Sequence, residues 1–119
     1  MNKEELKSRT KRFALRVINL VEALPKTVTG RAIGNQLVRC GTGVGANYRA
    51  SCRARSRAEF IAKIGIVEEE ADESAFWMEL IIERKLLSAA KVQPLLKEAN
   101  ELVAIMAASR ISAKRASNT

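Results

Sequence analysis

The chain of 119 residues contains no histidine, and only 4% of its residues are aromatic. Histidine is the commonest general acid–base residue and a frequent metal ligand, so its absence removes the usual catalytic and metal centres. Just two prolines interrupt a composition rich in helix-forming residues. The sequence therefore favours a protein that assembles and binds over an enzyme, and we name no catalytic, cofactor-binding or metal-ligating residue.

Cysteine and long apolar runs are also scarce. Cys40 and Cys52 lie twelve residues apart in one predicted helix, about 18 Å at the usual rise, which is too far for a disulfide. Free thiols are typical of a reducing compartment, so we expect a cytoplasmic protein. The longest apolar run, Leu102–Ala108, is far shorter than the roughly 18 residues of a membrane span, so we expect no membrane partner.

The charge is strongly basic and unevenly distributed. The net charge is +8, but residues 1–57 hold thirteen basic and three acidic side chains, and residues 58–83 hold one basic and eight acidic ones. A basic excess attracts nucleic acid or anionic lipid. The alternative is a solvated surface together with an internal match of acids and bases, and both interpretations stay open on composition alone.

Apolar side chains recur three, four or seven residues apart over four segments, and no segment alternates as a strand would. Thr29 and Ser56 are predicted N-caps, and Pro94 is expected in the first turn of the last helix. Short connections favour antiparallel neighbours, so we predict an all-α, up-down-up-down four-helix bundle over residues 1–110. Residues 111–119 are expected to form a flexible basic tail. The predicted helices are 3–24, 29–53, 57–88 and 94–112.

The segment 41–46, Gly-Thr-Gly-Val-Gly-Ala, matches a dinucleotide-binding fingerprint as a string. That fingerprint requires a preceding strand, whereas an amphipathic helix is predicted here, so we reject it. Glycine costs up to about 1 kcal/mol inside a helix. Gly41 and Gly45 therefore indicate close approach of another helix. Asn47 falls on the predicted apolar side, and we expect it to bind an acidic side chain of the third helix.

The third predicted helix combines a run of acids with a wide apolar surface. Part of the run from Glu68 to Glu73 is expected to pair with arginines of the second helix or of a neighbouring subunit. Phe76, Trp77 and Leu80 extend the apolar surface beyond one side of the helix. A helix of this kind is either deeply buried or meets another chain, and we predict that these three residues form an oligomer interface.

Two segments of the sequence, 37–49 and 56–77, carry a resemblance to a known family. The chain resembles the four-helix bundle proteins encoded in intervening sequences of bacterial large-subunit ribosomal RNA genes, sometimes labelled S23 ribosomal proteins. The match runs from about Phe13 to Ile105. One departure is Ala50, where family members often have a glutamate after Asn-Tyr-Arg.

The resemblance implies a ring-shaped homopentamer. It also implies kinship with the accessory variability determinant of diversity-generating retroelements, which binds nucleic acid and a reverse transcriptase. We therefore predict a non-enzymatic homo-oligomer that binds RNA or DNA through phosphates, with a reverse transcriptase as a further possible partner. The alternative is a protein-binding scaffold without affinity for nucleic acid. Two basic patches are the candidate contacts: Arg49, Arg53, Arg55 and Arg57 in the first, and Lys7, Lys11, Arg12 and Arg16 in the second.

Overall fold

A computed structural model describes residues 1–117, which form four helices and, over that part of the chain, no strand. The molecule is a rod of 51 × 21 × 19 Å. The all-α fold predicted from the sequence is confirmed. The helices are α1 (Lys3–Glu22), α2 (Val28–Ser51), α3 (Arg57–Glu83) and α4 (Ala89–Ser117).

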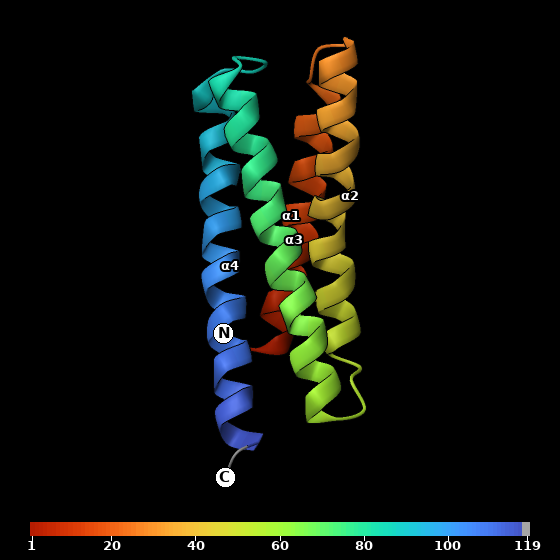
Figure 1. The fold of residues 1–119 in the computed structure, drawn as a ribbon, viewed down its shortest axis with the longest axis vertical. Coiled ribbons are helices and arrows are strands. Elements are labelled where there is room, and N and C mark those ends of the chain that lie inside the picture. The colour runs from red at the N-terminus through yellow and green to blue at the C-terminus, as the bar shows by residue number, and fades with distance from the viewer. Residues whose placement is uncertain (118–119) are drawn as a thin grey trace.

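Successive helices run in opposite directions and pack side by side, as predicted for an up-down-up-down bundle (Figure 1). Contacts between α1 and α4 close the bundle but are fewer than those between successive helices. The start of α1, the end of α4 and the α2–α3 loop lie at the same end of the rod, which is lowest in Figure 1. This topology gathers three segments that are far apart in the sequence. None of the described helices is long and apolar enough to cross a membrane.

The core is formed by the apolar sides that the spacing predicts. Phe13 and Val17 of α1, Leu37 of α2, Met78 of α3 and Leu102 of α4 are all almost fully buried. Burying a side chain of this size stabilises the fold by about 1.5–3 kcal/mol. The heptad pattern therefore identified the inner side of every helix correctly.

Two predicted N-caps had different outcomes. Ser56 caps α3 as expected, because its side chain accepts a hydrogen bond from the backbone N–H of Glu59 at 3.0 Å. The prediction for α2 is wrong by two residues. Thr27, not Thr29, accepts from the N–H of Gly30, also at 3.0 Å.

The α3–α4 connection differs most from the sequence prediction. α3 ends at Glu83, five residues early, because Lys85 adopts a left-handed φ of 55°. The N–H of Leu86 then bonds the carbonyl of Ile81, which is a Schellman ending without its usual glycine. α4 begins at Ala89, so Pro94 lies in its second turn and not its first.

The last helix is also longer at its other end. α4 continues to Ser117, beyond the end predicted at residue 112, so most of the expected tail is helical. The flexibility of this tail stays a prediction. Residues 118–119 lie outside the part of the chain that the structure describes.

Glycines of α2 set the distance between α1 and α2. A Cβ added at Gly41 would lie 2.6 Å from the Val17 Cγ1 atom, and one at Gly45 would lie 3.2 Å from the backbone oxygen of Thr10. Neither position therefore has room for a side chain unless the helices move apart. The close packing predicted from the glycine spacing is confirmed.

We expect Gly41→Ala to destabilise the protein by about 1–3 kcal/mol, because the added methyl group would overlap Val17, which is buried and has a stiff side chain. This cost should exceed the gain from the higher helix propensity of alanine. The matched control is Gly65→Ala in α3, where nothing lies within 4 Å of the added Cβ. That change should stabilise by about 0.5–1 kcal/mol. Urea unfolding measures both, and a stabilising Gly41→Ala would contradict the close approach.

Candidate nucleic-acid interface

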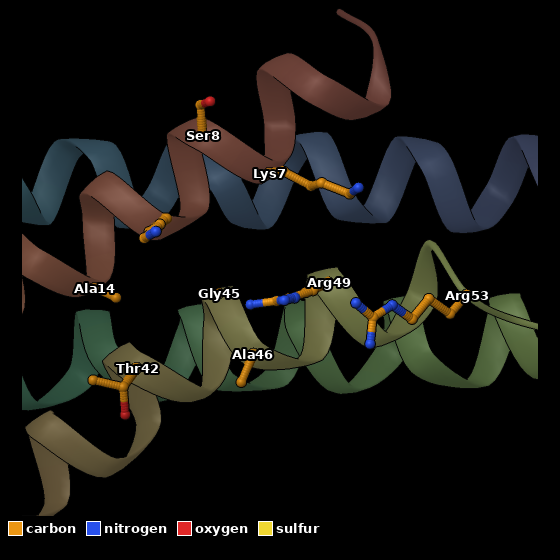
Figure 2. Close-up of a pocket in the computed structure, with 9 residues that line it drawn as sticks. Lys7, Ser8, Ala14, Thr42, Gly45, Ala46, Arg49 and Arg53 are labelled. Atoms are coloured by element: carbon orange, nitrogen blue, oxygen red, sulfur yellow. The ribbon is translucent and has the colours of Figure 1, made fainter.

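A groove between α1 and α2 brings together two residues from each predicted basic patch. Its volume is about 430 Å³, and it is lined by Lys7 and Lys11 of α1, by Arg49 of α2 and by Arg53, which follows the end of α2. Figure 2 shows Lys7, Arg49 and Arg53 along the same stretch of the groove. The two pairs lie 38 or more residues apart in sequence, and the antiparallel pairing of α1 with α2 makes them neighbours.

The groove is hollow because small residues line its floor. Ala14, Gly45 and Ala46 contribute almost no side-chain volume there (Figure 2). Ser8 and Thr42 complete the lining, and the Thr42 hydroxyl donates to the carbonyl of Val38 at 2.6 Å. The sequence prediction missed these lining residues. The small residues after Arg39 were interpreted only as a site of close helix packing. Because their side chains are small, they also leave a groove between the long side chains of the lysines and arginines.

The groove belongs to a larger basic surface. We define the basic end as residues 1–12, 49–63 and 107–117, which meet where the start of α1, the end of α4 and the α2–α3 loop lie (Figure 1). These segments hold thirteen basic and three acidic side chains, a net charge of +10. The whole chain carries +8, so the remainder of the molecule is slightly acidic. A concentrated field of this kind attracts polyanions.

The guanidinium groups of the first predicted patch have no acidic partner within the part of the chain that the structure describes. Within residues 1–117, no guanidinium group of Arg49, Arg53, Arg55 or Arg57 forms an ion pair. Arg49, Arg53, Arg55 and Arg57 are all exposed. Four cations crowded at one end repel one another, and a bound anion would relieve that repulsion.

Other arginines hold the bundle together instead. Arg9 of α1 donates two hydrogen bonds of 2.7 Å to the carboxylate of Glu98 in α4, and a third of 3.1 Å to Glu101. The Glu98 hydrogen bonds raise the pKa of Arg9 further, so it stays charged. Arg110 of α4 likewise donates to Glu68 of α3 at 2.8 Å. Paired arginines join helices, whereas the unpaired ones face solvent.

The remaining predicted contacts occupy different places. Arg55 lies in the α2–α3 loop, and Arg57 begins α3 at the same end. Arg12 lines a shallow hollow formed by the first residues of α1. Arg16 lies beside Lys91 and Leu95 of α4. Arg12 therefore lies within the basic end but outside the groove, and Arg16 is separated from both.

The acidic run of α3 is only partly solvated. Glu73 accepts a hydrogen bond of 2.8 Å from Arg39 of α2, as the predicted pairing of this run with the second helix requires, and Glu68 accepts from α4. The prediction for Asn47 is wrong. Its amide donates to the carbonyl of Gly43, 2.9 Å away on its own helix, because that acceptor lies one turn back and within reach.

Glu70 faces Gly43 across the α2–α3 contact. One of its carboxylate oxygens is buried and lacks a hydrogen-bond partner within residues 1–117. Burial raises the pKa of Glu70, the nearby charge of Arg39 partly opposes this, and Glu73 and Glu69 add to the rise. The charged form of Glu70 is therefore unfavourable in the folded protein.

The buried thiol of Cys40 and the buried phenol of Tyr48 are both held in their neutral forms. Cys40 is buried, and burial raises the pKa of its thiol, which disfavours the nucleophilic thiolate. Burial and the neighbouring Cys52 likewise raise the pKa of Tyr48. Over residues 1–117 no group of three or more acidic or cysteine side chains converges on a metal-sized site.

The predicted oligomer surface lies on α3, away from the basic end. Phe76 is 50% exposed, and its ring meets that of Trp77 edge-on, with centroids 5.1 Å apart. The indole N–H of Trp77 donates to Glu73 at 3.2 Å, and Leu80 is half-buried one turn further along α3. This places an aromatic pair at the surface of the bundle.

Comparison with known proteins decides the family. Residues 3–108 match the family model described as 23S rRNA-intervening sequence protein. The chain belongs to this family. The resemblance inferred from segments 37–49 and 56–77 is thereby confirmed, while the link to the accessory variability determinant stays a prediction. Among curated proteins no relative reaches significance.

A solved structure supports the same assignment. The chain is similar to a protein of unknown function from the S23 ribosomal protein family of Bacteroides thetaiotaomicron VPI-5482, whose crystal structure extends to 1.70 Å resolution. The two share 30% sequence identity with a TM-score of 0.83. The similarity covers 88% of this chain and 97% of the other. The intervening-sequence family therefore contributes a fold and a genetic setting, but no activity.

We expect Glu70→Gln to stabilise the protein at pH 7. Folding raises the pKa of Glu70 above its usual value of 4.5. Ionised Glu70 therefore destabilises the folded protein, and this destabilisation grows as the pH rises from 4.5 through the pKa of the folded state. Glutamine mimics the protonated form, so the gain should vanish near pH 4. The control is the exposed neighbour Glu69→Gln. Urea unfolding across pH measures both, and a pH-independent difference would contradict the assignment.

Proposed function

We propose that this protein binds RNA or DNA through its basic end, as a non-enzymatic bundle. The observation that carries the proposal is a set of four exposed arginines whose guanidinium groups form no ion pair within residues 1–117, whereas other arginines pair with carboxylates; the four are Arg49, Arg53, Arg55 and Arg57. Arg49 and Arg53 line the groove with Lys7 and Lys11, of which Lys7 also contacts Glu4 at 3.3 Å. Ion pairs within the chain therefore do not explain why these four arginines lie together. The family's genetic setting within 23S ribosomal RNA genes agrees with an RNA partner.

The chemistry of the groove favours phosphate contacts. Lysine and arginine line it, while its floor offers methyl groups, two hydroxyls and backbone. Such a surface attracts the sugar–phosphate backbone but offers few groups that distinguish bases. We therefore expect binding that is insensitive to base sequence and falls steeply as salt rises, because counterions are released on binding.

The test replaces Arg53, Arg55 and Arg57 together with glutamine. We expect affinity for a single-stranded oligonucleotide to fall at least about tenfold at low salt, and the slope of log affinity against log salt to become shallower by about 2. Fluorescence anisotropy over a salt series measures both quantities. The matched control is the triple glutamine variant of Lys26, Arg31 and Lys91, which are exposed basic residues outside the basic end.

The same experiment distinguishes the proposed function from the alternative, a protein-binding scaffold. If the arginine variant lost its oligomeric state while keeping its helical signal, the arginines would belong to subunit contacts, and a protein-binding scaffold would be the better account. Absence of binding to RNA and DNA by the unmodified protein at low salt would contradict the proposed function outright. The reverse transcriptase implied as a partner by the resemblance stays a prediction.

We further propose that the protein is a closed homo-oligomer, with a pentamer as the expected state. The support for an interface is the exposed aromatic pair of Phe76 and Trp77 beside Leu80, whereas the number five comes from the resemblance alone. In a ring the basic end is repeated around an axis, so weak contacts with one nucleic acid add through multivalency.

Phe76→Glu should dissociate the oligomer without unfolding the chain, because Phe76 is 50% exposed and its replacement leaves the core intact. Sedimentation should then show a 13.1 kDa species in place of a larger one. The control is Leu15→Glu on α1, where the wild-type side chain is 54% exposed. An unmodified protein that sediments at 13.1 kDa even when concentrated would contradict oligomerisation.

A further inference from the structure

The basic end carries a second groove, between α3 and α4. Its volume is about 550 Å³, and it is lined by Arg57 and Phe60 of α3 and by Ser109, Ser112, Ala113 and Ala116 of α4. The α4 lining consists of hydroxyl and methyl side chains, so none of these lining residues has a bulky side chain over the aromatic ring. Phe60 is half-buried: part of it packs against the core, and the remainder lines the groove.

Phe60 differs from the other aromatic residues of the chain. Phe13 and Tyr48 are buried in the core. Phe76 and Trp77 lie at least sixteen residues further along α3, about 24 Å away at the helical rise. Phe60 is therefore the aromatic side chain that reaches the surface at the basic end, next to a cation that has no acidic partner.

We propose that this groove takes an unpaired nucleobase, stacked on Phe60, while Arg57 contacts the adjoining phosphate. The inference rests on the proposed function and extends it to a class of ligand, namely single strands whose bases are free. A base has an apolar face for the aromatic ring and polar edges for the hydroxyls of Ser109 and Ser112. Stacking on an aromatic side chain tolerates every base, which agrees with binding that ignores sequence.

The test compares a single-stranded oligonucleotide with an abasic strand of equal length at low salt, by fluorescence anisotropy. Both strands carry the same phosphates, so only stacking separates them. We expect the strand with bases to bind the wild-type protein about tenfold more tightly. Phe60→Leu should abolish that ratio without changing affinity for the abasic strand, and Phe60→Trp should retain it. Leu15→Ala, which shortens an exposed apolar side chain outside both the basic end and the proposed oligomer interface, is the matched control.

The possible outcomes distinguish base stacking on Phe60 from the proposed function, which is nucleic-acid binding by the basic end. A wild-type ratio near one, a ratio that Phe60→Leu leaves unchanged, or tighter binding of a duplex than of a single strand would overturn base stacking while the basic end still bound phosphates. Absence of binding to both strands would instead overturn the proposed function. Should Phe60→Leu lose its helical signal, Phe60→Trp in a Trp77→Phe background decides, because only bases should quench its fluorescence.

Discussion

The close approach of α1 and α2 determines how charge is arranged at the basic end. Side chains are absent at Gly41 and Gly45, so α1 lies directly against the backbone of α2. That contact leaves a hollow between the helices, lined by lysines of α1, by Arg49 of α2 and by Arg53 just after α2. A bulkier residue at Gly41 would push against Val17 and shift α1 relative to these arginines. The arrangement of the cations thus depends on packing as much as on charge.

The distribution of acids explains why some arginines are available and others are not. The carboxylates lie mainly along the middle of α3 and on α4, where they meet Arg9, Arg39 and Arg110 and connect neighbouring helices. The Arg9 and Arg110 pairs are partly buried and hydrogen-bonded, so they are stronger than an exposed pair such as Arg39–Glu73. The guanidinium groups near the α2–α3 loop, by contrast, have no carboxylate partner within residues 1–117 and repel one another in the free protein. Binding of a polyanion would offset this repulsion, whereas binding of a neutral partner would leave it in place.

Local patterns predicted the helices and their inner sides, but not how the surfaces combine. The helix ends near Lys85 and Pro94 were misplaced because a left-handed lysine replaces the usual glycine signal and because proline is tolerated in a second turn. The basic residues were identified individually, but the sequence did not show that part of each patch lines one groove. Only the pairing of antiparallel helices brings Lys11 opposite Arg49 and leaves Arg16 beside α4. Phe60 continues the apolar spacing of α3, and periodicity does not show where a core ends.

The central claim is that nucleic acid meets this protein at one end of the bundle. Ultraviolet crosslinking of the unmodified protein to a single-stranded oligonucleotide, followed by mass spectrometry of the attached peptides, tests it most directly. The account predicts crosslinks within residues 1–12, 49–63 and 107–117, with residue 60 among the attachment sites. Crosslinks concentrated on the middle of α3, around Glu73 and Trp77, would contradict it.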